Sequence, residues 1–447
     1  MPHAQCYPLT GPVAHVIVAP AATYSTETNA VLKGVHMKRF RTPVLVLLCL
    51  MMVAAPSFLG CGGKESTTKE IKYGWIWDFT GRASFGVVQT YVGFSDCLRM
   101  IQEEDPIPGV RISLEIYDTE SDAANVPLGY DYMKGKGVHI LSAAPQDTEL
   151  LRSRFESDQI PFYALSNIKS MVDCEWLTTL YGPPELQIET QLEWISQNWD
   201  GYPTKPKVGF IGLAGVSFYI SQEATVREWV QAHPDDFEWL GSSFAPSTTT
   251  SWTLEIKKYE KADYIFVSMS GPPQVSLLKE ARARGYANRF MGPSETWFSF
   301  YGLLRAGVSP TDLNNVIAGT YTPWWGDDNS FMDEVEEYAE KYHSAAELTT
   351  IHQGTGQFNG WAAGMIFVDA VRRAVKEVGA EDLDGVAIHN ALKETDLSVP
   401  GWGNAWKLPG KENVNYFAQT VRLVEYKSDV DNWVAVTEFA YPPSMRT

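Results

Sequence analysis

The chain has 447 residues, of which 45% are hydrophobic, and this length exceeds one ordinary hydrophobic core, so we expect two domains. Its 54 acidic residues outnumber its 36 basic residues, which gives a net charge of −18 with neutral histidines. Nucleic acids and anionic lipid headgroups repel such a surface, so we exclude both as partners.

The segment that ends at residue 60 has the pattern of an export signal. Met37–Arg41 is basic, and Val44–Leu59 is apolar but too short to span a membrane comfortably. We therefore interpret 37–60 as a signal peptide. Residues 1–36 precede this signal and lack helical or strand periodicity, so we interpret them as a misassigned upstream extension and Met37 as the true start.

Cys61 follows this signal directly, in the sequence Phe58-Leu59-Gly60-Cys61. The pattern resembles the lipobox of bacterial lipoproteins, in which the cysteine thiol carries a diacylglycerol, although Phe58 replaces the leucine preferred there. The resemblance implies a protein that works outside the cytoplasm and is tied to the membrane through its lipid anchor only, with 61–70 as a flexible tether. The alternative is an uncleaved anchor helix in which Cys61 has no role.

An alternation of strand and helix patterns begins at Lys72. The run Lys72–Trp77 carries an aromatic residue at every second position, and Val110–Tyr117 alternates apolar and polar side chains, as half-buried strands do. Further strands are expected at 138–143 and 160–165, and helices at 88–104, 130–136 and 149–158. This order predicts a parallel sheet with helices on both faces.

The same alternation then starts again. Strands are expected at 207–213, 263–268, 290–292 and 316–319, with helices at 185–199, 221–232 and 274–284, the last of which ends at Gly285. Apolar residues at helical spacing predict two amphipathic helices, at 331–342 and 361–375. The tail from Trp402 is rich in aromatic residues, and its alternating runs at 421–426 and 433–439 predict antiparallel strands.

Several segments follow these elements in a characteristic order. They are Asp78–Gly86, Tyr117–Asp122, Pro161–Ser166, Leu277–Tyr286, Phe358–Val375 and Ala391–Asp396. Their order and spacing resemble those of the type I periplasmic binding proteins of the leucine/isoleucine/valine-binding class, which serve ABC importers. The resemblance implies an α/β fold of two doubly wound parallel-sheet lobes, joined by a three-strand hinge, that close on a small ligand.

The resemblance also divides the chain between the lobes. We expect 71–183 and about 318–395 in lobe 1, and 184–317 and about 396–447 in lobe 2. Each lobe takes two separate stretches because the chain crosses the hinge three times in this family.

Ligands of such folds bind beyond the carboxyl ends of the strands, so the loops after the strands are the candidate sites. In the first lobe, the resemblance points to ligand-binding residues at Phe85, Gln146, Asp147, Ala164 and Ser166. Asp147 departs from the family, because it brings a negative charge to a helix start where hydroxyl and backbone N–H groups commonly hold a ligand carboxylate. This departure puts an ordinary α-amino acid in doubt, unless Asp147 serves only as a helix N-cap.

In the second lobe, the resemblance points to Phe218, Tyr219, Glu295 and Trp297. An aromatic at 218 or 219 closes over the ligand in the family, and Glu295 stands where amino-acid binders often have an acidic residue for the ammonium group. The alternative for Glu295 is a glutamate on a surface loop. Two acids with aromatic walls favour a cationic or amine-bearing ligand, and an aliphatic or aromatic amino acid is the competing ligand.

The sequence gives no sign of catalysis or of metal binding. It lacks the Gly-x-Ser-x-Gly and His-Glu-x-x-His patterns, and its histidines have no metal-ligand spacing. We therefore expect no enzyme activity, no catalytic residue, no cofactor and no metal. Cys97 and Cys174 belong to the same expected lobe, and the sequence leaves a disulfide between them open.

These observations favour an extracytoplasmic solute-binding component of an ABC importer that captures a small amino-acid-like or amphipathic ligand by lobe closure. Its expected partners are that ligand and the ABC permease subunits, and we expect a monomer. One alternative is a ligand-sensing module of a signalling system, and another is an exported α/β hydrolase.

Overall fold

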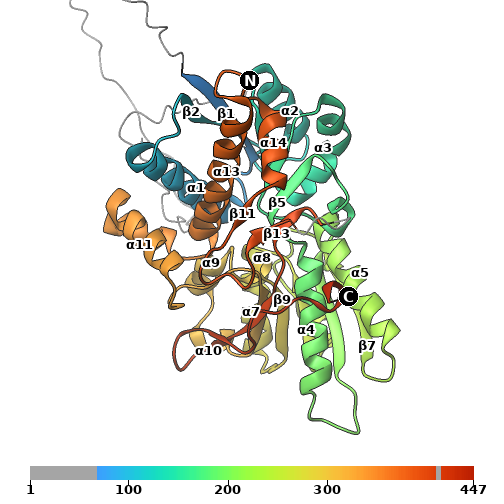
Figure 1. Cartoon of the computed structure of the whole chain (residues 1–447). Coiled ribbons are helices and arrows are strands. Elements are labelled where there is room, and N and C mark those ends of the chain that lie inside the picture. The colour runs from blue at the N-terminus through green and yellow to red at the C-terminus, as the bar shows by residue number, and fades with distance from the viewer. Residues whose placement is uncertain (1–67, 409–413, 447) are drawn as a thin grey trace, which may run out of the picture. The chain divides into compact units, whose positions relative to one another are not determined.

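The computed structural model describes residues 68–408 and 414–446 (Figure 1). The expected upstream extension, the signal peptide and Cys61 lie outside the described residues, as does most of the 61–70 tether. Within the described ranges, no helix is both long and apolar enough to cross a membrane.

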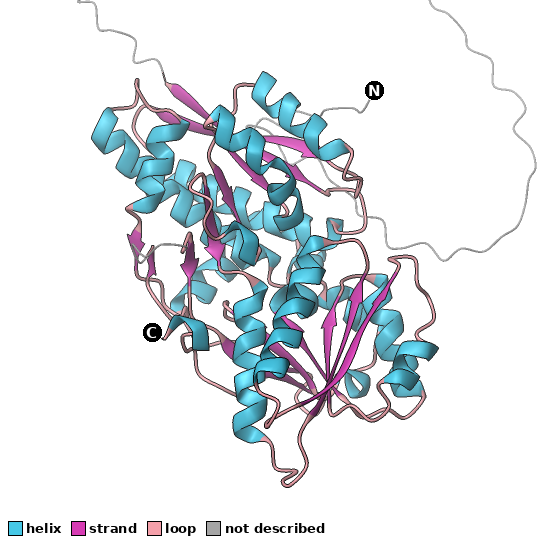
Figure 2. Cartoon of the chain, turned by 90° about the vertical axis from the view of Figure 1, so that its right-hand side faces the viewer, coloured by secondary structure: helices cyan, strands magenta, loops and turns pink. Residues whose placement is uncertain are grey.

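The first sheet has six strands in the order β13-β5-β4-β3-β1-β2, and all of its pairings are parallel. Its strands are β1 (Lys69–Trp77), β2 (Val110–Asp118), β3 (Ile140–Ala143), β4 (Phe162–Ala164), β5 (Leu177–Tyr181) and β13 (Tyr416–Ala418). Helices pack on both faces of it (Figure 2). They are α1 (Ser84–Glu104), α2 (Asn125–Gly135), α3 (Pro145–Asp158), α13 (Gly356–Val378) and α14 (Gly385–Lys393).

The alternation of β1 explains how this sheet buries both of its faces. Tyr73 and Trp75 join a hydrophobic cluster with side chains of α1 and α13, while Ile76 joins another cluster with side chains of α2 and α3. Successive side chains of a strand point to opposite faces, so one strand contributes to both layers. The helical layers on the two faces confirm the doubly wound arrangement expected for the first lobe.

The second sheet has seven strands in the order β15-β14-β10-β9-β8-β6-β7. Its strands are β6 (Lys207–Leu213), β7 (Glu238–Ala245), β8 (Tyr264–Ser268), β9 (Arg289–Pro293), β10 (Val316–Thr320), β14 (Arg422–Lys427) and β15 (Asn432–Ala435). The pairings from β7 to β10 are parallel, whereas β14 and β15 form an antiparallel hairpin at the edge. Its helices are α4 (Pro184–Asn198), α5 (Ser217–Ala232), α6 (Thr253–Lys258), α7 (Pro272–Ala283), α8 (Ser294–Trp297), α9 (Tyr301–Gly307) and α10 (Pro310–Leu313).

The chain passes between the two sheets three times, after β5, after β10 and after β13. The first two crossings contact each other. The hydroxyl of Tyr321, just after β10, donates to the carbonyl oxygen of Pro183, 2.8 Å away in the first crossing. The ring of Tyr321 also stacks on that of Tyr181, with 5.7 Å between the centroids. These contacts hold two of the three connecting segments side by side.

The expected assignment of 396–447 to the second lobe is wrong in one part. Tyr416–Ala418 forms β13, which pairs in parallel with β5 at the edge of the first sheet. All three residues of β13 are buried, and a run this short shows no alternation that sequence reasoning could recognise. Before it, β11 (Asp396–Leu397) and β12 (Trp406–Lys407) form a separate antiparallel pair. The other lobe boundaries stay a prediction.

Helices α1 and α13 pack unusually closely because glycines line their contact. A Cβ atom on Gly93 of α1 would lie 1.8 Å from the backbone oxygen of Gln357, and one on Gly360 of α13 would lie 2.0 Å from that of Thr90. Both distances are far inside van der Waals contact, so only glycine fits at these two positions. This contact joins a late part of the chain to the first helix of the sheet. The connecting helices α11 (Ser330–Tyr342) and α12 (Ala345–Ile351) precede α13.

Candidate functional site

The carboxyl ends of β1 and β3 bring an acidic pair together at one edge of the first sheet. The two strands are neighbours, with Ile76 opposite Ala143. Asp78 follows β1, and its two carboxylate oxygens accept hydrogen bonds from the backbone N–H groups of Gly81 and Ala83, at 2.6 and 2.8 Å. Asp78 therefore fixes the loop that leads into α1.

Asp147 lies near Asp78, as the third residue of α3. The N-cap of this helix is Ala144, with no side-chain cap, so the interpretation of Asp147 as an N-cap is wrong. Within the described residues, its carboxylate has no hydrogen bond and no ion pair with a side chain. Burial and the neighbouring charge of Asp78 raise the pKa of Asp147 to about 7. Asp147 is thus a partly buried carboxyl group that lacks a basic partner.

The other expected residues of the first lobe lie at the same edge. Gln146 is half-buried in the first turn of α3, and Ala164 ends β4, the neighbour of β3. Ser166 is buried two residues further on, and no described side chain or backbone group bonds to its hydroxyl. The register of the parallel strands therefore gathers Gln146, Asp147, Ala164 and Ser166 in one place.

Glu295 occupies the corresponding edge of the second sheet, in helix α8 directly after β9. Its Oε2 accepts hydrogen bonds from Nε2 of Gln187 at 2.9 Å and from the hydroxyl of Ser294 at 3.2 Å. Its Oε1 is buried and has no partner among the described residues. Burial raises the pKa of Glu295 to about 7, and the charge of Glu185 adds to the effect. Glu295 is therefore not a residue of an exposed loop.

Glu185 is a member of this edge that the sequence reasoning missed. It lies in the first turn of α4, directly after the first crossing, and is only 1% exposed. Its Oε1 accepts a long hydrogen bond of 3.5 Å from the backbone N–H of Lys169, while its Oε2 is buried and has no partner within 68–408 and 414–446. Burial raises its pKa. The one signal in the sequence is an acidic residue immediately after the Gly182-Pro183-Pro184 turn, which reads equally well as an ordinary first-turn glutamate.

Three aromatic residues lie between the two sheets. Phe218 is the second residue of α5 in the second lobe, is 8% exposed and packs in a hydrophobic cluster of first-lobe residues. Tyr219 places its hydroxyl 3.0 Å from that of Ser270, which follows β8. Phe85 reaches from α1 to α9, since a Cβ atom on Gly302 would lie 2.4 Å from its ring. Phe85 and Phe218 therefore form contacts between the lobes, and Tyr219 flanks these contacts.

Trp297 is placed differently from the other expected residues. It is 0% exposed and belongs to the hydrophobic cluster of the second sheet. Its indole lies against the backbone of β9, where a Cβ atom on Gly292 would be 2.9 Å from its Nε1. The structure therefore does not bring Trp297 together with the residues between the lobes.

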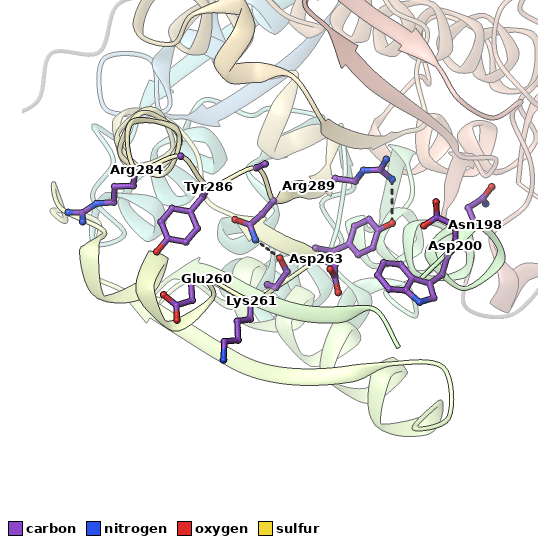
Figure 3. Close-up of a pocket in the computed structure, with 14 residues that line it drawn as sticks. Asn198, Asp200, Glu260, Lys261, Asp263, Arg284, Tyr286 and Arg289 are labelled. Carbon is purple, nitrogen blue, oxygen red and sulfur yellow. Dashed lines mark hydrogen bonds between the residues drawn. The ribbon is translucent and has the colours of Figure 1, made fainter. Parts of the chain in front are cut away.

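An open pocket of about 780 Å³ lies elsewhere, at the amino ends of strands β8 and β9 (Figure 3). It is lined by 198–200, 260–264 and 284–289. Arg289 donates from its guanidinium to the hydroxyl of Tyr264 at 3.4 Å in this pocket. None of the site residues expected from the sequence lines it. Because ligands of α/β sheets bind at the carboxyl ends, we place the candidate site between the lobes and not in this pocket.

The structure shows the state of the two cysteines and the arrangement of the possible metal ligands. Cys97 and Cys174 are both buried free thiols, so the disulfide left open by the sequence is not formed in this structure. Across 68–408 and 414–446, no group of three or more His, Cys, Asp or Glu side chains is arranged to hold a metal ion.

Comparison with known proteins gives a family and a fold. The profile of the periplasmic binding protein family matches residues 70–431. A branched chain amino acid ABC transporter from Thermus thermophilus with bound valine has a TM-score of 0.73 at 17% identity, over 84% of this chain and 97% of that one. A fatty acid ABC transporter substrate-binding protein from Thermomonospora curvata has a TM-score of 0.70 at 16% identity, over 84% and 93%.

A third similar structure is an ABC transporter solute binding protein from R. palustris in complex with benzoate. Its TM-score is 0.66 at 14% identity, over 83% of this chain and 97% of that one. At such identities these structures show a shared fold alone. No curated protein matches the chain.

Proposed function

The chain belongs to the periplasmic binding protein family, and on that premise we propose that it is the extracytoplasmic solute-binding component of an ABC importer. It would trap a small ligand between its two lobes and present the closed form to the permease subunits. The names of the similar structures, which include substrate-binding proteins of ABC transporters, support this role. Lipid attachment at Cys61 would keep the protein at the membrane surface, and we propose that it acts as a monomer.

The ligand we propose is amphipathic or amino-acid-like and bears an amine. The observation that carries this proposal concerns Asp147 and Glu295, on opposite lobes. Among the described residues, the Asp147 carboxylate has no hydrogen bond, and Oε1 of Glu295 is buried without a partner. An ammonium group supplies hydrogen-bond donors and a positive charge, and both satisfy such oxygens. Phe85 and Tyr219 offer the aromatic surface against which the apolar part of the ligand, or a cation, can pack.

We propose that binding involves no catalysis. The polar groups gathered at the site within the described residues are carboxyl, amide and hydroxyl groups, and no histidine among them is hydrogen-bonded to the hydroxyl of Ser166. A hydroxyl without a base remains a weak nucleophile. These groups suit recognition of a ligand by charge and hydrogen bonds.

Native mass spectrometry of the full-length chain as purified tests the proposal directly. We expect a small molecule to leave the protein on activation, and the same molecule to stabilise the emptied protein when added back. At 100 times its dissociation constant, a ligand raises the free energy of unfolding by about 2.7 kcal/mol. A protein that carries no small molecule, and that no amine or amino acid stabilises, would contradict the role as a binding protein.

A further inference from the structure

Four carboxyl groups form two pairs between the lobes. The first pair is Asp78 and Asp147, beyond β1 and β3. The second pair is Glu185 and Glu295, beyond β5 and β9. Within the described residues, none of the four makes an ion pair with a basic side chain. The two pairs are therefore acidic and take part in no ion pair among these residues.

In the first pair, the two carboxylates have different tasks. Asp78 is held by the N–H groups of its own loop and by the hydroxyl of Ser121. Asp147 has no such donors, and the charge of Asp78 acts on it. A ligand cation placed against Asp147 would supply the missing donors and offset the repulsion between the two acids.

In the second pair, one side chain organises the other groups. Gln187 donates to Oε2 of Glu295, and its own Oε1 accepts from the backbone N–H of Ser294 at 2.8 Å. The remaining oxygens, Oε2 of Glu185 and Oε1 of Glu295, are buried and have no partner in the part of the chain that the structure describes. Buried acceptors without donors cost free energy, so a ligand that supplies hydrogen-bond donors to these oxygens would bind favourably here.

Two basic side chains lie near the pairs, and neither forms an ion pair with them in the described part of the chain. Arg82 is exposed and donates across the lobes to the hydroxyl of Ser247, at 2.7 Å. Lys169 is exposed and bonds to Glu185 through its backbone N–H, and its charge opposes part of the rise in the pKa of Glu185. A zwitterionic amino acid would match one carboxylate pair with its ammonium group, but its carboxylate would then meet the other acidic edge or have to avoid it.

We propose that the ligand carries two separated amine cations, one for each carboxylate pair, and is therefore an aliphatic diamine rather than an amino acid. This inference rests on the proposed binding function and specifies its ligand class. It assigns the first cation to Asp147 beside Asp78, and the second to Glu185 and Glu295.

Isothermal titration of the full-length chain, freed of any bound molecule, tests this inference with three probes. They are 1,4-diaminobutane, with two cations; 1-aminobutane, with one; and leucine, with one cation and one carboxylate. We expect 1,4-diaminobutane to bind most tightly, and 1-aminobutane to bind about 10- to 100-fold more weakly, because it loses one charged contact. Since this comparison uses the unaltered protein, it does not depend on the folding of any variant.

Two substitutions then test which carboxylate pair binds each end of the diamine. Asp147→Asn and Glu295→Gln should each weaken 1,4-diaminobutane by about 10- to 100-fold. The matched control is Asp235→Asn, which removes a carboxylate whose side chain is fully exposed, and we expect no change. In each variant, one amine of the diamine loses its carboxylate partner. The advantage of 1,4-diaminobutane over 1-aminobutane should therefore nearly vanish in both.

The outcomes separate this inference from the proposed function. If leucine binds more tightly than both amines, or if Asp147→Asn leaves the diamine affinity unchanged, the diamine inference is overturned while the binding function stands. If none of the probes binds and no small molecule accompanies the purified protein, both are overturned.

Discussion

At the scale of single residues, the carboxyl group of Asp147 makes stability depend on pH. Burial and the charge of Asp78 raise its pKa to about 7, well above the ordinary value of about 3.9. The folded protein therefore binds this proton more tightly than the unfolded chain. The resulting stabilisation is complete below about pH 4 and is lost as the pH rises through 7.

Asp147→Asn should consequently be more stable than the parent at pH 8 and equally stable at pH 4. We expect a gain on the order of 1–2 kcal/mol at pH 8, after a discount for solvent screening of this partly buried group. Chemical denaturation of the ligand-free protein at both pH values measures it. An equal difference at pH 4 and pH 8 would show that the ionisation of Asp147 has no part in stability.

Cys61 supports a prediction that depends on the sequence alone. If Cys61 carries the lipid, Cys61→Ser should release the protein from the membrane or leave its signal uncleaved. Fractionation of cells and the mass of the mature chain measure both outcomes. Deletion of 1–36 should leave export unchanged if Met37 is the true start. Normal processing and membrane attachment of the Cys61→Ser chain would rule out the lipid anchor.

The residues of the candidate site show what a sequence can and cannot predict at this scale. The positions of Asp147 and Glu295 could be predicted because both residues follow strands, and the ends of parallel strands share one edge. The position of Glu185 could not, because its burial and its contact with Lys169 arise only in the folded chain. Trp297 follows a strand too, but its ring packs into the core of the second sheet. Packing decides this orientation, and the spacing of residues in the sequence does not show it.

At the scale of elements, the contact between α1 and α13 gives a sharp test of packing. Gly360→Ala would place a Cβ atom 2.0 Å from the backbone oxygen of Thr90, so the two helices must move apart. We expect a loss of stability of about 3 kcal/mol, at the upper end of the usual cost of overpacking, because the obstructing atom is backbone and cannot rotate away.

The matched control for this change is Gly135→Ala at the end of α2, where no described atom lies within 4 Å of the added methyl group. Alanine favours the helix over glycine by up to about 1 kcal/mol, so the control should be neutral or stabilising. Urea denaturation of both variants measures the contrast. Equal stabilities would mean that α1 and α13 do not pack as closely as described.

The elements themselves were predictable where alternation is regular. The expected strand at 207–213 is β6, and the expected strands at 72–77 and 110–117 lie within β1 and β2. Strand β5 was missed because its residues Leu177–Tyr181 are buried on both faces, and two buried threonines break the apolar pattern. Strand β7 was missed for the opposite reason, since it lies at the edge of its sheet and is half-exposed along most of its length.

At the scale of the whole molecule, contacts between the lobes lie on several elements. Arg82 bonds to Ser247, Phe85 touches Gly302, and Phe218 packs with first-lobe side chains. Each contact exists only while the lobes are close together, so together they favour the closed arrangement over an open one. The three crossings let the lobes separate without breaking either sheet.

Phe218→Ala should therefore shift the molecule toward an open arrangement. The side chain belongs to α5 but is buried among first-lobe residues, so its loss weakens closure more than it weakens the second lobe itself. Burial of a phenylalanine side chain contributes about 1.5–3 kcal/mol, which corresponds to about a 10- to 100-fold loss of affinity for a ligand that requires closure. We expect this loss for whichever of 1,4-diaminobutane and leucine binds more tightly. We also expect a larger radius of gyration of the ligand-free protein in X-ray scattering.

Ile220→Ala, two residues further along the same helix at a position 48% exposed, is the control and should change neither quantity. If Phe218→Ala instead lowers the stability of the ligand-free protein while leaving affinity and radius of gyration unchanged, Phe218 serves the core of the protein and not the closure of its lobes.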